Sequence, residues 1–331
     1  MKALQLVESG KLAIVEVDRP VIKEGQVLLK MKAAALNRRD QWIREGKYPN
    51  IQLHTTLGSD GCGEVIEVSN DDDRHWVGKE VVVNPNVNWG DNPNVQAVDY
   101  SVLGMPVDGT FAEYLAVDVD RLVERPVHLD ETQSAALPLG GLTAYRAIMK
   151  HGQLSSSNNV LISGFGGGVA QFAFQFGIAV GAKMYVTSGN ESKIRKAIEL
   201  GAIYGFDYNV ENWEKEAGNI MEGFDVVIDS AGGDAINTFI KIMRPGGRIV
   251  FYGATHGLPS KIDLYRMFWN QITLQGSTMG NDEEFVEMID FVSQHKLIPL
   301  IDSVRPFSDI VSAFDQMKEG QRLGKLVIKF Y

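Results

Sequence analysis

The fold class of this chain is decided by the stretch Val160-Leu161-Ile162-Ser163-Gly164-Phe165-Gly166-Gly167-Gly168-Val169-Ala170. A short apolar run leads into a glycine cluster, and residues 171–177 then predict a helix. Glycines let the backbone approach a pyrophosphate, whose charge is attracted by the free N–H groups at a helix N-terminus. The stretch therefore predicts the binding turn of a nicotinamide or flavin dinucleotide, although its spacing fits G-x-x-G-x-x-A better than G-x-G-x-x-G. The alternative is a structural turn that binds no phosphate.

Five further strand-like runs follow this turn and give it a context. They cover residues 183–188, 203–207, 224–231, 248–253 and 273–277. Helical patterns separate most of these runs, as a doubly wound parallel sheet requires. The first helix is expected to be covered on more than one side, because its apolar residues are Phe172, Phe174, Phe176 and Ile178.

Two later helices carry recognisable start signals. Ser188 is followed by Glu191, and Asn281 by Glu284, which in each case predicts an N-cap with an acid three residues further on. The second of these helices has the spacing of one buried face, formed by Phe285, Met288, Ile289 and Val292.

Composition limits the class of protein. With 331 residues, of which 44% are hydrophobic, the chain can bury two cores, so two domains are expected. The net charge of −10 and the lack of any Lys/Arg-rich block disfavour nucleic acid and anionic membranes as partners. No apolar run approaches the roughly 20 residues that cross a bilayer, and because residues 1–8 lack a long apolar region we expect no signal peptide. Cys62 is the single cysteine, which excludes an internal disulfide and a Cys-rich zinc site. We expect a soluble cytoplasmic protein.

The N-terminal third of the chain reads differently from the middle. Strand-like runs at 11–17, 26–35, 63–68 and 80–83 alternate with turns and predict a β-rich domain. The segment 84–109 is rich in Asn, Pro, Gly and Asp, and it is long for a loop of a compact domain, so we interpret it as functional or vestigial. Residues 132–150 predict helix, and residues 325–330 predict a closing strand.

An ordered series of motifs runs through almost the whole chain. The motifs are Ala35-Leu36-Asn37-Arg38-Arg39-Asp40, Gly46-Lys47-Tyr48-Pro49, Gly58-Ser59-Asp60-Gly61-Cys62-Gly63, Gly109-Thr110-Phe111-Ala112-Glu113-Tyr114, Pro138-Leu139-Gly140-Gly141-Leu142-Thr143-Ala144-Tyr145, Arg244-Pro245-Gly246-Gly247 and Leu323-Gly324-Lys325-Leu326-Val327. The series resembles the medium-chain dehydrogenase/reductase superfamily, and within it the zinc-free, quinone-oxidoreductase-like members. The resemblance implies a GroES-like catalytic domain over residues 1–125 and a Rossmann domain over 126–266. It also implies that segment 267–331 returns to the first domain, and that the chain forms a homodimer.

The resemblance also locates the catalytic zinc ligands of zinc-dependent relatives. Those positions match Asn37, Ser59 and Gly140 in this chain. Glycine has no ligating side chain, and neutral Asn or Ser cannot replace thiolate and imidazole. The segment 84–109, which carries structural cysteines in zinc-binding relatives, contains none. We therefore expect no metal, although the presence of this segment suggests a zinc-type ancestor.

The end of the second strand of the expected Rossmann domain, residues 183–188, distinguishes NAD from NADP. NAD binders often place an acid there for the ribose 2′-OH, whereas this chain has Ser188-Gly189-Asn190 and then Lys193. The resemblance matches Ser188, Lys193 and Tyr208 to this position, so we expect NADPH, unless Lys193 is an ordinary solvated helix residue. The residues expected to bind the cofactor are Asn37, Thr143, Gly164, Gly166, Gly167, Gly168, Val169, Ser188, Lys193, Tyr208, Gly253, Gly276 and Lys325.

Without a metal, the oxyanion formed when hydride reaches the substrate needs hydrogen-bond donors. The resemblance places Asn37, Asp40 and Thr143 near the nicotinamide, and Tyr48 is the best phenol for donating a proton. The residues expected to be catalytic are Asn37, Asp40, Tyr48 and Thr143, and those expected to contact substrate are Trp42, Tyr48 and Ser59. Packing explains Trp42 and Tyr48 about as well, and Asp40 could simply brace its own turn. Cys62 is assigned no catalytic role.

These residues predict a zinc-independent, NADPH-dependent reductase of a quinone or an α,β-unsaturated carbonyl. Water or Tyr48 would supply the proton. Two alternatives stay open: a zinc-type alcohol dehydrogenase, and a protein that binds NADPH as a sensor without turnover. The physiological acceptor does not follow from the sequence.

Overall fold

The computed structural model describes residues 1–331 and separates into two compact units. Unit 1 comprises Met1–Gly140 and Asn281–Tyr331, and unit 2 comprises Gly141–Gly280. The boundaries after Gly140 and Gly280 lie further along the chain than the expected ones. No helix in the structure combines the length and the apolar character that crossing a membrane demands.

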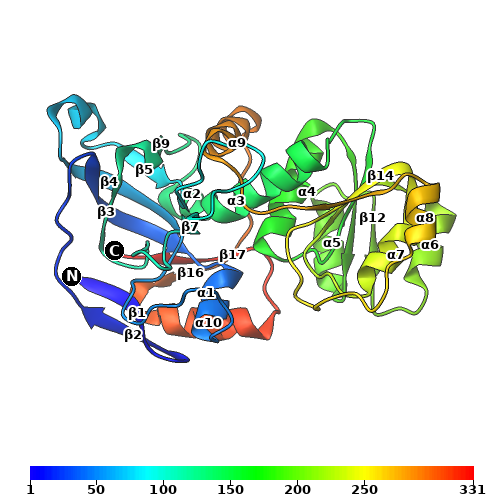
Figure 1. Cartoon of the computed structure of the whole chain (residues 1–331), viewed down its shortest axis with the longest axis horizontal. Helices are drawn as coiled ribbons and strands as arrows, with labels where there is room; N and C mark the ends of the chain where they lie inside the picture. The colour runs from blue at the N-terminus through cyan, green and yellow to red at the C-terminus, as the bar shows by residue number, and fades with distance from the viewer. The chain divides into compact units, whose positions relative to one another are not determined.

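Unit 2 is built on a six-stranded, all-parallel sheet (Figure 1). Its strands are β10 (Asn159–Ile162), β11 (Lys183–Ser188), β12 (Tyr204–Asp207), β13 (Phe224–Asp229), β14 (Met243–Phe251) and β15 (Thr273–Gly276). The spatial order is β12-β11-β10-β13-β14-β15, so β10, the first strand of this unit, lies between its second strand, β11, and its fourth, β13. This is the doubly wound order of dinucleotide-binding folds. The predicted fold class is therefore confirmed.

Helices lie on both sides of this sheet (Figure 1). They are α4 (Gly168–Val180), α5 (Glu191–Glu199), α6 (Trp213–Ile220), α7 (Ala235–Ile242) and α8 (Leu264–Trp269). Helix α4 buries Phe172, Phe174 and Phe176, which point to more than one side of the helix. Ile178 is more than one-third exposed, so the expected coverage stops before the last turn of α4.

The start of α5 differs from the expected one. Asn190, not Ser188, is the N-cap, because its side chain accepts hydrogen bonds from the backbone N–H groups of Ser192 and Lys193. Ser188 is the last residue of β11, and its Oγ accepts from the backbone N–H of Asn190 at 3.2 Å. A turn of two residues therefore separates strand from helix, which leaves Ser188 at the strand tip.

Unit 1 contains a seven-stranded sheet of order β16-β17-β3-β4-β5-β9, with β8 also paired to β3. The strands are β3 (Gln26–Ala35), β4 (Asp60–Val68), β5 (Glu80–Val83), β8 (Tyr114–Asp118), β9 (Leu122–Glu124), β16 (Ile301–Pro306) and β17 (Lys325–Lys329). Two small hairpins, β1 (Lys2–Glu8) with β2 (Lys11–Glu16) and β6 (Asn86–Val87) with β7 (Ser101–Val102), complete the β structure. Strand β17 runs antiparallel to β3, with Val327 opposite Ala35, so the end of the chain returns to its N-terminal part.

The helical elements of unit 1 are short except for two. They are α1 (Arg38–Arg44), α2 (Glu131–Ala135), α9 (Asp282–His295), α10 (Ile310–Glu319) and the 3-10 turns η1 (Asp71–Trp76), η2 (Val119–Arg121) and η4 (Phe307–Asp309). Asn281 caps α9 in a capping box with Glu284, as predicted, and the expected face of α9 is buried. The helix expected over 132–150 is divided into α2, α3 (Pro138–Tyr145) and the π-helical η3 (Arg146–His151).

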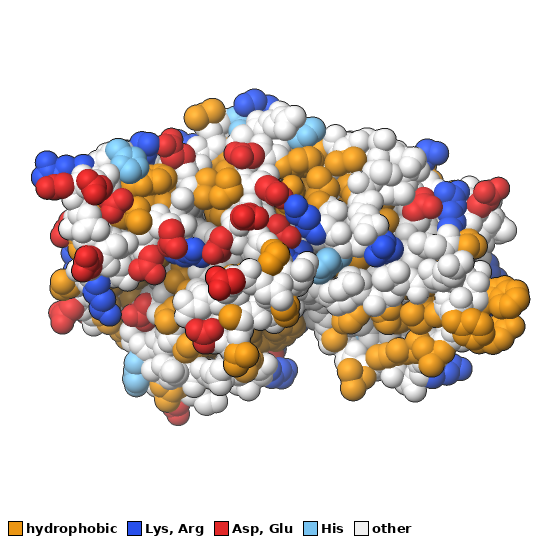
Figure 2. Space-filling model, turned by 45° about the horizontal axis from the view of Figure 1, so that its top comes forward, with side chains coloured by type: hydrophobic (Ala, Val, Ile, Leu, Met, Phe, Trp, Pro, Cys, Tyr) orange, Lys and Arg blue, Asp and Glu red, His pale blue; other side chains and the backbone are white.

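One exposed apolar patch lies on α8 of unit 2. Its residues are Leu264, Tyr265, Phe268 and Trp269, whose exposed fractions are 64 to 70%. The rings of Tyr265 and Trp269 stack with centroids 6.2 Å apart. Figure 2 shows orange side chains gathered at the right of the view, over this part of unit 2.

Candidate active site

A buried lysine joins two polar side chains of unit 1. The Nζ of Lys325 donates a hydrogen bond to Oδ1 of Asn37 at 2.6 Å and to Oδ2 of Asp60 at 2.7 Å. The contact follows from the pairing of β17 with β3, which the bond from Leu36 N–H to the carbonyl of Leu326 extends by one residue. The sheet therefore holds an ammonium group against the first residues after β3.

Asp60 is fully buried and is held at both ends. Its Oδ1 accepts from the backbone N–H of Leu139 at 2.7 Å, and its backbone carbonyl accepts from Thr110 Oγ1 at 2.7 Å. A buried carboxylate needs such partners, because desolvation of an unpaired charge is costly. Asp60 is not among the site residues predicted from the sequence. The signal was available, since Asp60 is a charged residue between glycines at the start of a buried strand.

Asn37 and Asp40 form the N-terminal capping box of α1. The backbone N–H of Asn37 donates to Oδ2 of Asp40 at 2.8 Å. Asp40 therefore stabilises its own turn, which is the structural alternative to the catalytic role expected from the sequence. Burial raises the pKa of Asp40 to about 6, against the opposing positive charge of Arg39. The other oxygen, Oδ1 of Asp40, and the amide nitrogen Nδ2 of Asn37 are buried without a hydrogen-bond partner.

The buried Arg39 donates hydrogen bonds to Ser59 and Tyr48. Its Nη1 donates to Oγ of Ser59 at 2.5 Å and to the carbonyl of Leu103 at 2.7 Å. Its Nε donates to the phenol oxygen of Tyr48 at 3.2 Å, and its guanidinium lies over the Tyr48 ring at 4.7 Å from the centroid. Arg39 was not selected from the sequence. Only the fold shows that this arginine is buried and organises the residues around it.

Trp42 and Cys62 lie in the same unit, and their side chains are not part of the hydrogen-bond network around Lys325 and Arg39. Trp42 is half-buried on α1, and its backbone carbonyl accepts from the N–H of Lys47. Cys62 is fully buried in β4, and burial raises the pKa of its thiol to about 12. A thiol with such a pKa is not a nucleophile at neutral pH, which agrees with assigning it no catalytic role.

The glycine turn of unit 2 has the backbone that its sequence predicts. Gly164 and Gly166 have φ values of +66° and +141°, and Gly167 is the N-cap of α4. The turn is tied to β11, because Phe165 N–H donates to the carbonyl of Thr187 and Gly164 N–H donates to its Oγ1. The N–H groups at the start of α4, at Gly168 and Val169, thereby stand at the carboxyl edge of the sheet.

Asp229 lies where the strand order reverses, between β10 and β13, and its carboxylate accepts two hydrogen bonds there. Ser163 Oγ donates to Oδ1 of Asp229, and the N–H of Gly232 donates to its Oδ2 at 2.8 Å. The side chain is fully buried and closes the turn after β13. Asp229 is therefore a turn residue at the end of a strand, at the position where doubly wound folds bind dinucleotides.

Ser188, Lys193 and Tyr208 lie around the same end of β11. The ring of Tyr208 lies against Gly189, where a Cβ atom would be 2.7 Å from Cε2. The Lys193 side chain covers Gly166, with Nζ 3.0 Å from a Cβ atom built there. Asn209 Nδ2 donates to the carbonyl of Gly189 and holds the two loops together. The fold thus brings Lys193 against the glycine turn and Tyr208 against Gly189, the residue next to Ser188.

The remaining predicted residues of unit 2 are more dispersed. Thr143 Oγ1 donates to Sδ of Met279 at 3.6 Å. Gly253 is packed against Ser230, whose carbonyl oxygen would lie 2.9 Å from an added Cβ, so the backbone there approaches closely. Gly276 ends β15 and leaves room for a side chain, with Phe251 no nearer than 3.5 Å.

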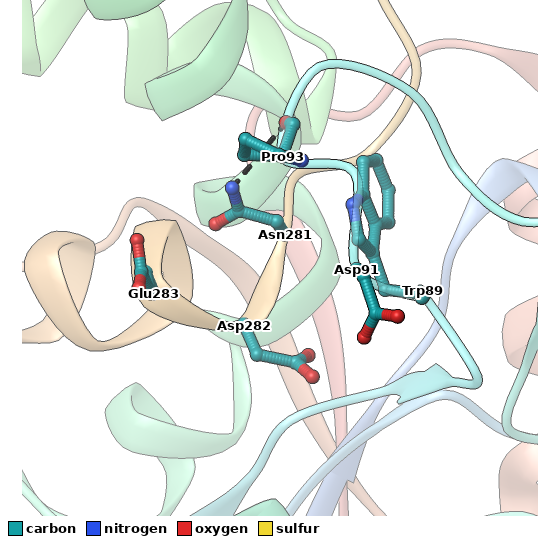
Figure 3. A pocket seen from close by; sticks show the side chains of 7 residues that line it. Trp89, Asp91, Pro93, Asn281, Asp282 and Glu283 are labelled. Carbon is teal, nitrogen blue, oxygen red and sulfur yellow. Dashed lines mark hydrogen bonds between the residues drawn. The ribbon is translucent and has the colours of Figure 1, made fainter.

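A pocket lies in unit 1 beside the 84–109 segment. It has a volume of about 230 Å³ and is lined by Trp89, Gly90, Asp91, Pro93, Asn281, Asp282 and Glu283. Figure 3 shows the Asn281 amide donating to the carbonyl of Pro93, with the Asp91 and Asp282 carboxylates nearby. Burial raises the pKa of Asp282, but hydrogen bonds from Arg121 and two asparagines outweigh it and lower that pKa. The acid therefore fastens the segment to the start of α9.

Comparisons with known proteins match both parts of the chain. A family model described as "Alcohol dehydrogenase GroES-like domain" matches residues 23–127, and one described as "Zinc-binding dehydrogenase" matches residues 168–294. The chain is 34% identical to zinc-type alcohol dehydrogenase-like protein YogA of Leptosphaeria maculans, over 95% of this chain and 93% of that protein. It is 31% identical to 2-methylene-furan-3-one reductase of Solanum lycopersicum, over 99% of this chain and 79% of that protein. A crystal structure of an NAD-dependent alcohol dehydrogenase matches with a TM-score of 0.93 at 30% identity, and all of both chains is covered.

Proposed function

Because the chain belongs to the medium-chain dehydrogenase/reductase superfamily, whose members are NAD(P)-dependent oxidoreductases, we propose that it transfers hydride from NADPH to a quinone or an α,β-unsaturated carbonyl without zinc. The observation that carries the proposal is the bond from the Lys325 ammonium to Asn37. Asn37 matches the first zinc-ligand position of metal-dependent relatives. In this chain its only side-chain oxygen faces a cation.

The second matched position is engaged in the same way. Ser59 accepts from the Arg39 guanidinium and donates to the carbonyl of Leu103. The third, Gly140, has no side chain, and nowhere in the structure do three His, Cys, Asp or Glu side chains gather as a metal site. Zn²⁺ takes thiolate, imidazole or carboxylate ligands, and two neutral oxygens bound by cations do not fit it. These contacts argue against a zinc-type alcohol dehydrogenase.

The residues of unit 2 fit NADPH. The glycine turn presents the N–H groups at the start of α4 to a pyrophosphate. Its residues Gly164 and Gly166 have positive φ values and no side chains of their own that would cover these groups. Ser188, Lys193 and Tyr208 provide a hydroxyl, an ammonium and a phenol for a 2′-phosphate, and no carboxylate ends β11. When bound, NADPH supplies the hydride.

Unit 1 would supply the groups around the acceptor. We assign Asn37 to the substrate oxygen, Trp42 to an apolar wall and Tyr48 or water to the proton. Asp40 holds Asn37 by its backbone, and Ser59 holds Arg39 beneath Tyr48. The relative named 2-methylene-furan-3-one reductase acts, by its name, on a conjugated ketone, which supports this class of acceptor.

We also propose that the chain forms a homodimer through unit 2. The α8 patch exposes four large apolar side chains, and β15 is the last strand of its sheet with an unpaired edge. Exposed apolar patches and open strand edges are typical of protein interfaces. A second copy of the chain could cover both.

The deciding experiment measures oxidation of NADPH and NADH by protein purified in chelator, with 1,4-benzoquinone, 9,10-phenanthrenequinone and simple enones as acceptors. We expect turnover with NADPH that is unchanged by chelator and by added Zn²⁺. Tight NADPH binding without turnover of any acceptor would contradict the proposal and favour an NADPH sensor. Alcohol oxidation that depends on one tightly bound zinc per chain would favour the alcohol dehydrogenase.

A further inference from the structure

The Lys325 ammonium has a hydrogen-bonding capacity that its partners do not use. An ammonium carries three N–H donors, and Lys325 directs two of them to Asn37 and Asp60. The side chain is only 3% exposed, so the third donor has little access to bulk water. A cation in such a place interacts strongly with any negative charge that forms beside it, because the surroundings screen it weakly.

Asn37 adds a second unused donor at the same place. An ammonium can only donate, so the oxygen of the Asn37 amide must face Lys325 and its nitrogen must face away. That nitrogen, Nδ2, is buried without a hydrogen-bond partner. A buried unsatisfied donor costs roughly 1–3 kcal/mol. A ligand oxygen that accepts a hydrogen bond would satisfy this donor.

The two donors are rigidly held. Asp60 fixes the ammonium, and Leu139 N–H fixes the other oxygen of Asp60. Asp40 fixes the backbone of Asn37 through the capping box of α1. Neither donor therefore needs to reorganise when charge appears, which is the condition for efficient electrostatic stabilisation of a transition state.

We propose that Lys325 is a catalytic residue, whose ammonium with the Asn37 amide binds the substrate carbonyl oxygen and stabilises the negative charge that hydride transfer places on it. This inference rests on the proposed function. The ammonium provides, from within the chain, the positive charge that zinc provides in metal-dependent relatives. It differs from the expectation that Lys325 binds the cofactor.

The charge balance of the step defines what Lys325 does. When the β-carbon of an enone accepts hydride, the C=C electron pair would form a double bond between the α-carbon and the carbonyl carbon, and the C=O π pair would move to the oxygen, giving an enolate; NADPH would supply the hydride and be left as NADP⁺. Water then protonates the α-carbon, and the hydroxide leaves to solvent. Lys325 keeps its proton throughout and contributes hydrogen bonding and charge.

A direct test removes the ammonium without leaving a buried unpaired carboxylate. Either single variant would leave one charge buried and unpaired, so the comparison is between the unmodified protein and the charge-neutral double variant Asp60→Asn/Lys325→Met. We expect kcat for the enone or quinone to fall about 100- to 1,000-fold between these two proteins. The KM for NADPH should change little. A difference in kcat below threefold would overturn the proposal.

A matched control lies on the same strand. Lys329 of β17 is exposed and pairs with Glu131 at the surface. Lys329→Met removes the same charge from the same strand, and it should leave kcat within twofold of the unmodified protein.

A binding measurement separates this proposal from failure of the proposed function. In the presence of NADP⁺, 4-nitrophenol serves as a probe, because its phenolate mimics the enolate oxygen and has a visible absorption band that the phenol lacks. We expect the unmodified protein to bind the phenolate at least tenfold more tightly than the double variant does, whether or not any acceptor is reduced. Equal phenolate binding by the two proteins would overturn the role of Lys325. Phenolate binding that depends on Lys325, in a protein that reduces no acceptor, would support the oxyanion site and refute only the reductase.

Discussion

The Nζ atom of Lys325 lies 2.7 Å from the Oδ2 atom of Asp60, and both side chains are buried in unit 1 although they are 265 positions apart in the chain. The pair couples the last strand of the large sheet to the start of β4. Burying two charges is costly, and their attraction repays this cost only when every remaining polar atom finds a partner. Two donors at this pair are unused, the third N–H of Lys325 and the amide Nδ2 of its neighbour Asn37. A purely structural ion pair would not retain them.

Breaking this pair from one side should destabilise the protein strongly. Lys325→Met leaves the Asp60 carboxylate buried with only the Leu139 N–H, and we expect a loss of about 3–5 kcal/mol in the free energy of unfolding. Asp60→Asn/Lys325→Met should recover most of that loss, because no buried charge remains. Urea unfolding at neutral pH measures both values. Equal stability of the single and the double variant would contradict the ion pair.

Asp40 should make stability depend on pH in an unusual direction. Its pKa is raised from an ordinary value of 3.8 to about 6 by burial, so the folded state binds the proton more tightly than the unfolded state. The free energy of unfolding should therefore fall as pH rises from about 4 to about 6, by about 3 kcal/mol in total for this group. Asp40→Asn cannot ionise and should lack this component. Urea midpoints of the two proteins between pH 4 and pH 7 test it, and parallel curves would contradict it.

Lys193 should determine preference for the 2′-phosphate. Lys193→Glu replaces attraction by repulsion, and we expect kcat/KM for NADPH to fall by about 10- to 100-fold, the range of a charge-assisted hydrogen bond. The value for NADH should change less than about threefold. Lys196→Glu is the matched control, because Lys196 lies on the same helix, pairs with Glu199 at 3.0 Å and is not one of the residues proposed to contact the 2′-phosphate. Equal losses with both cofactors would assign Lys193 a role unrelated to the 2′-phosphate.

The glycine turn should respond differently at two adjacent positions. Gly166 has a φ of +141°, which side chains rarely adopt, so Gly166→Ala should cost about 1–3 kcal/mol of stability. Gly167 has a φ of −76° and open space where a Cβ would lie. Gly167→Ala should therefore be neutral or stabilise by up to about 1 kcal/mol. Thermal unfolding in the absence of cofactor measures both, and similar losses would show that the turn differs from this description.

The α8 patch should mediate self-association. Trp269→Lys places a charge among exposed apolar side chains, and we expect the protein to change from dimer to monomer. Val286→Lys is the control, since Val286 is an exposed apolar residue outside the α8 patch, on α9 of unit 1. Light scattering after size-exclusion chromatography distinguishes the two masses. A monomeric unmodified protein would refute the proposed dimer.

Local patterns predicted much of the fold. The runs at 183–188 and 26–35 are strands with those bounds, and Asn281 caps α9 as its sequence indicates. Each of these features depends on neighbours in the chain, through strand alternation or the reach of a capping side chain. The start of α5 was placed wrongly, because Ser188 and Asn190 are both good caps and only the length of β11 decides between them.

The site was predicted less completely. Lys325 and Asn37 were predicted as separate site residues, Lys325 as a cofactor-binding one, and no sequence pattern indicated that they are in contact. Arg39 and Asp60 were not selected at all. Their importance follows from burial, because charged groups removed from water must find partners, and burial is a property of the folded chain.

The sequence by itself determined the dinucleotide-binding turn, the class of fold and the chemical character of the residues at the matched zinc positions. These depend on residue identity: glycine permits the backbone conformation of the turn, and Asn, Ser and Gly lack the ligand atoms that zinc prefers. Only the tertiary structure decided that the Lys325 ammonium stands beside Asn37 and Asp60. The pairing of β17 with β3 sets that contact, and no short-range pattern encodes a register between segments so far apart in the chain.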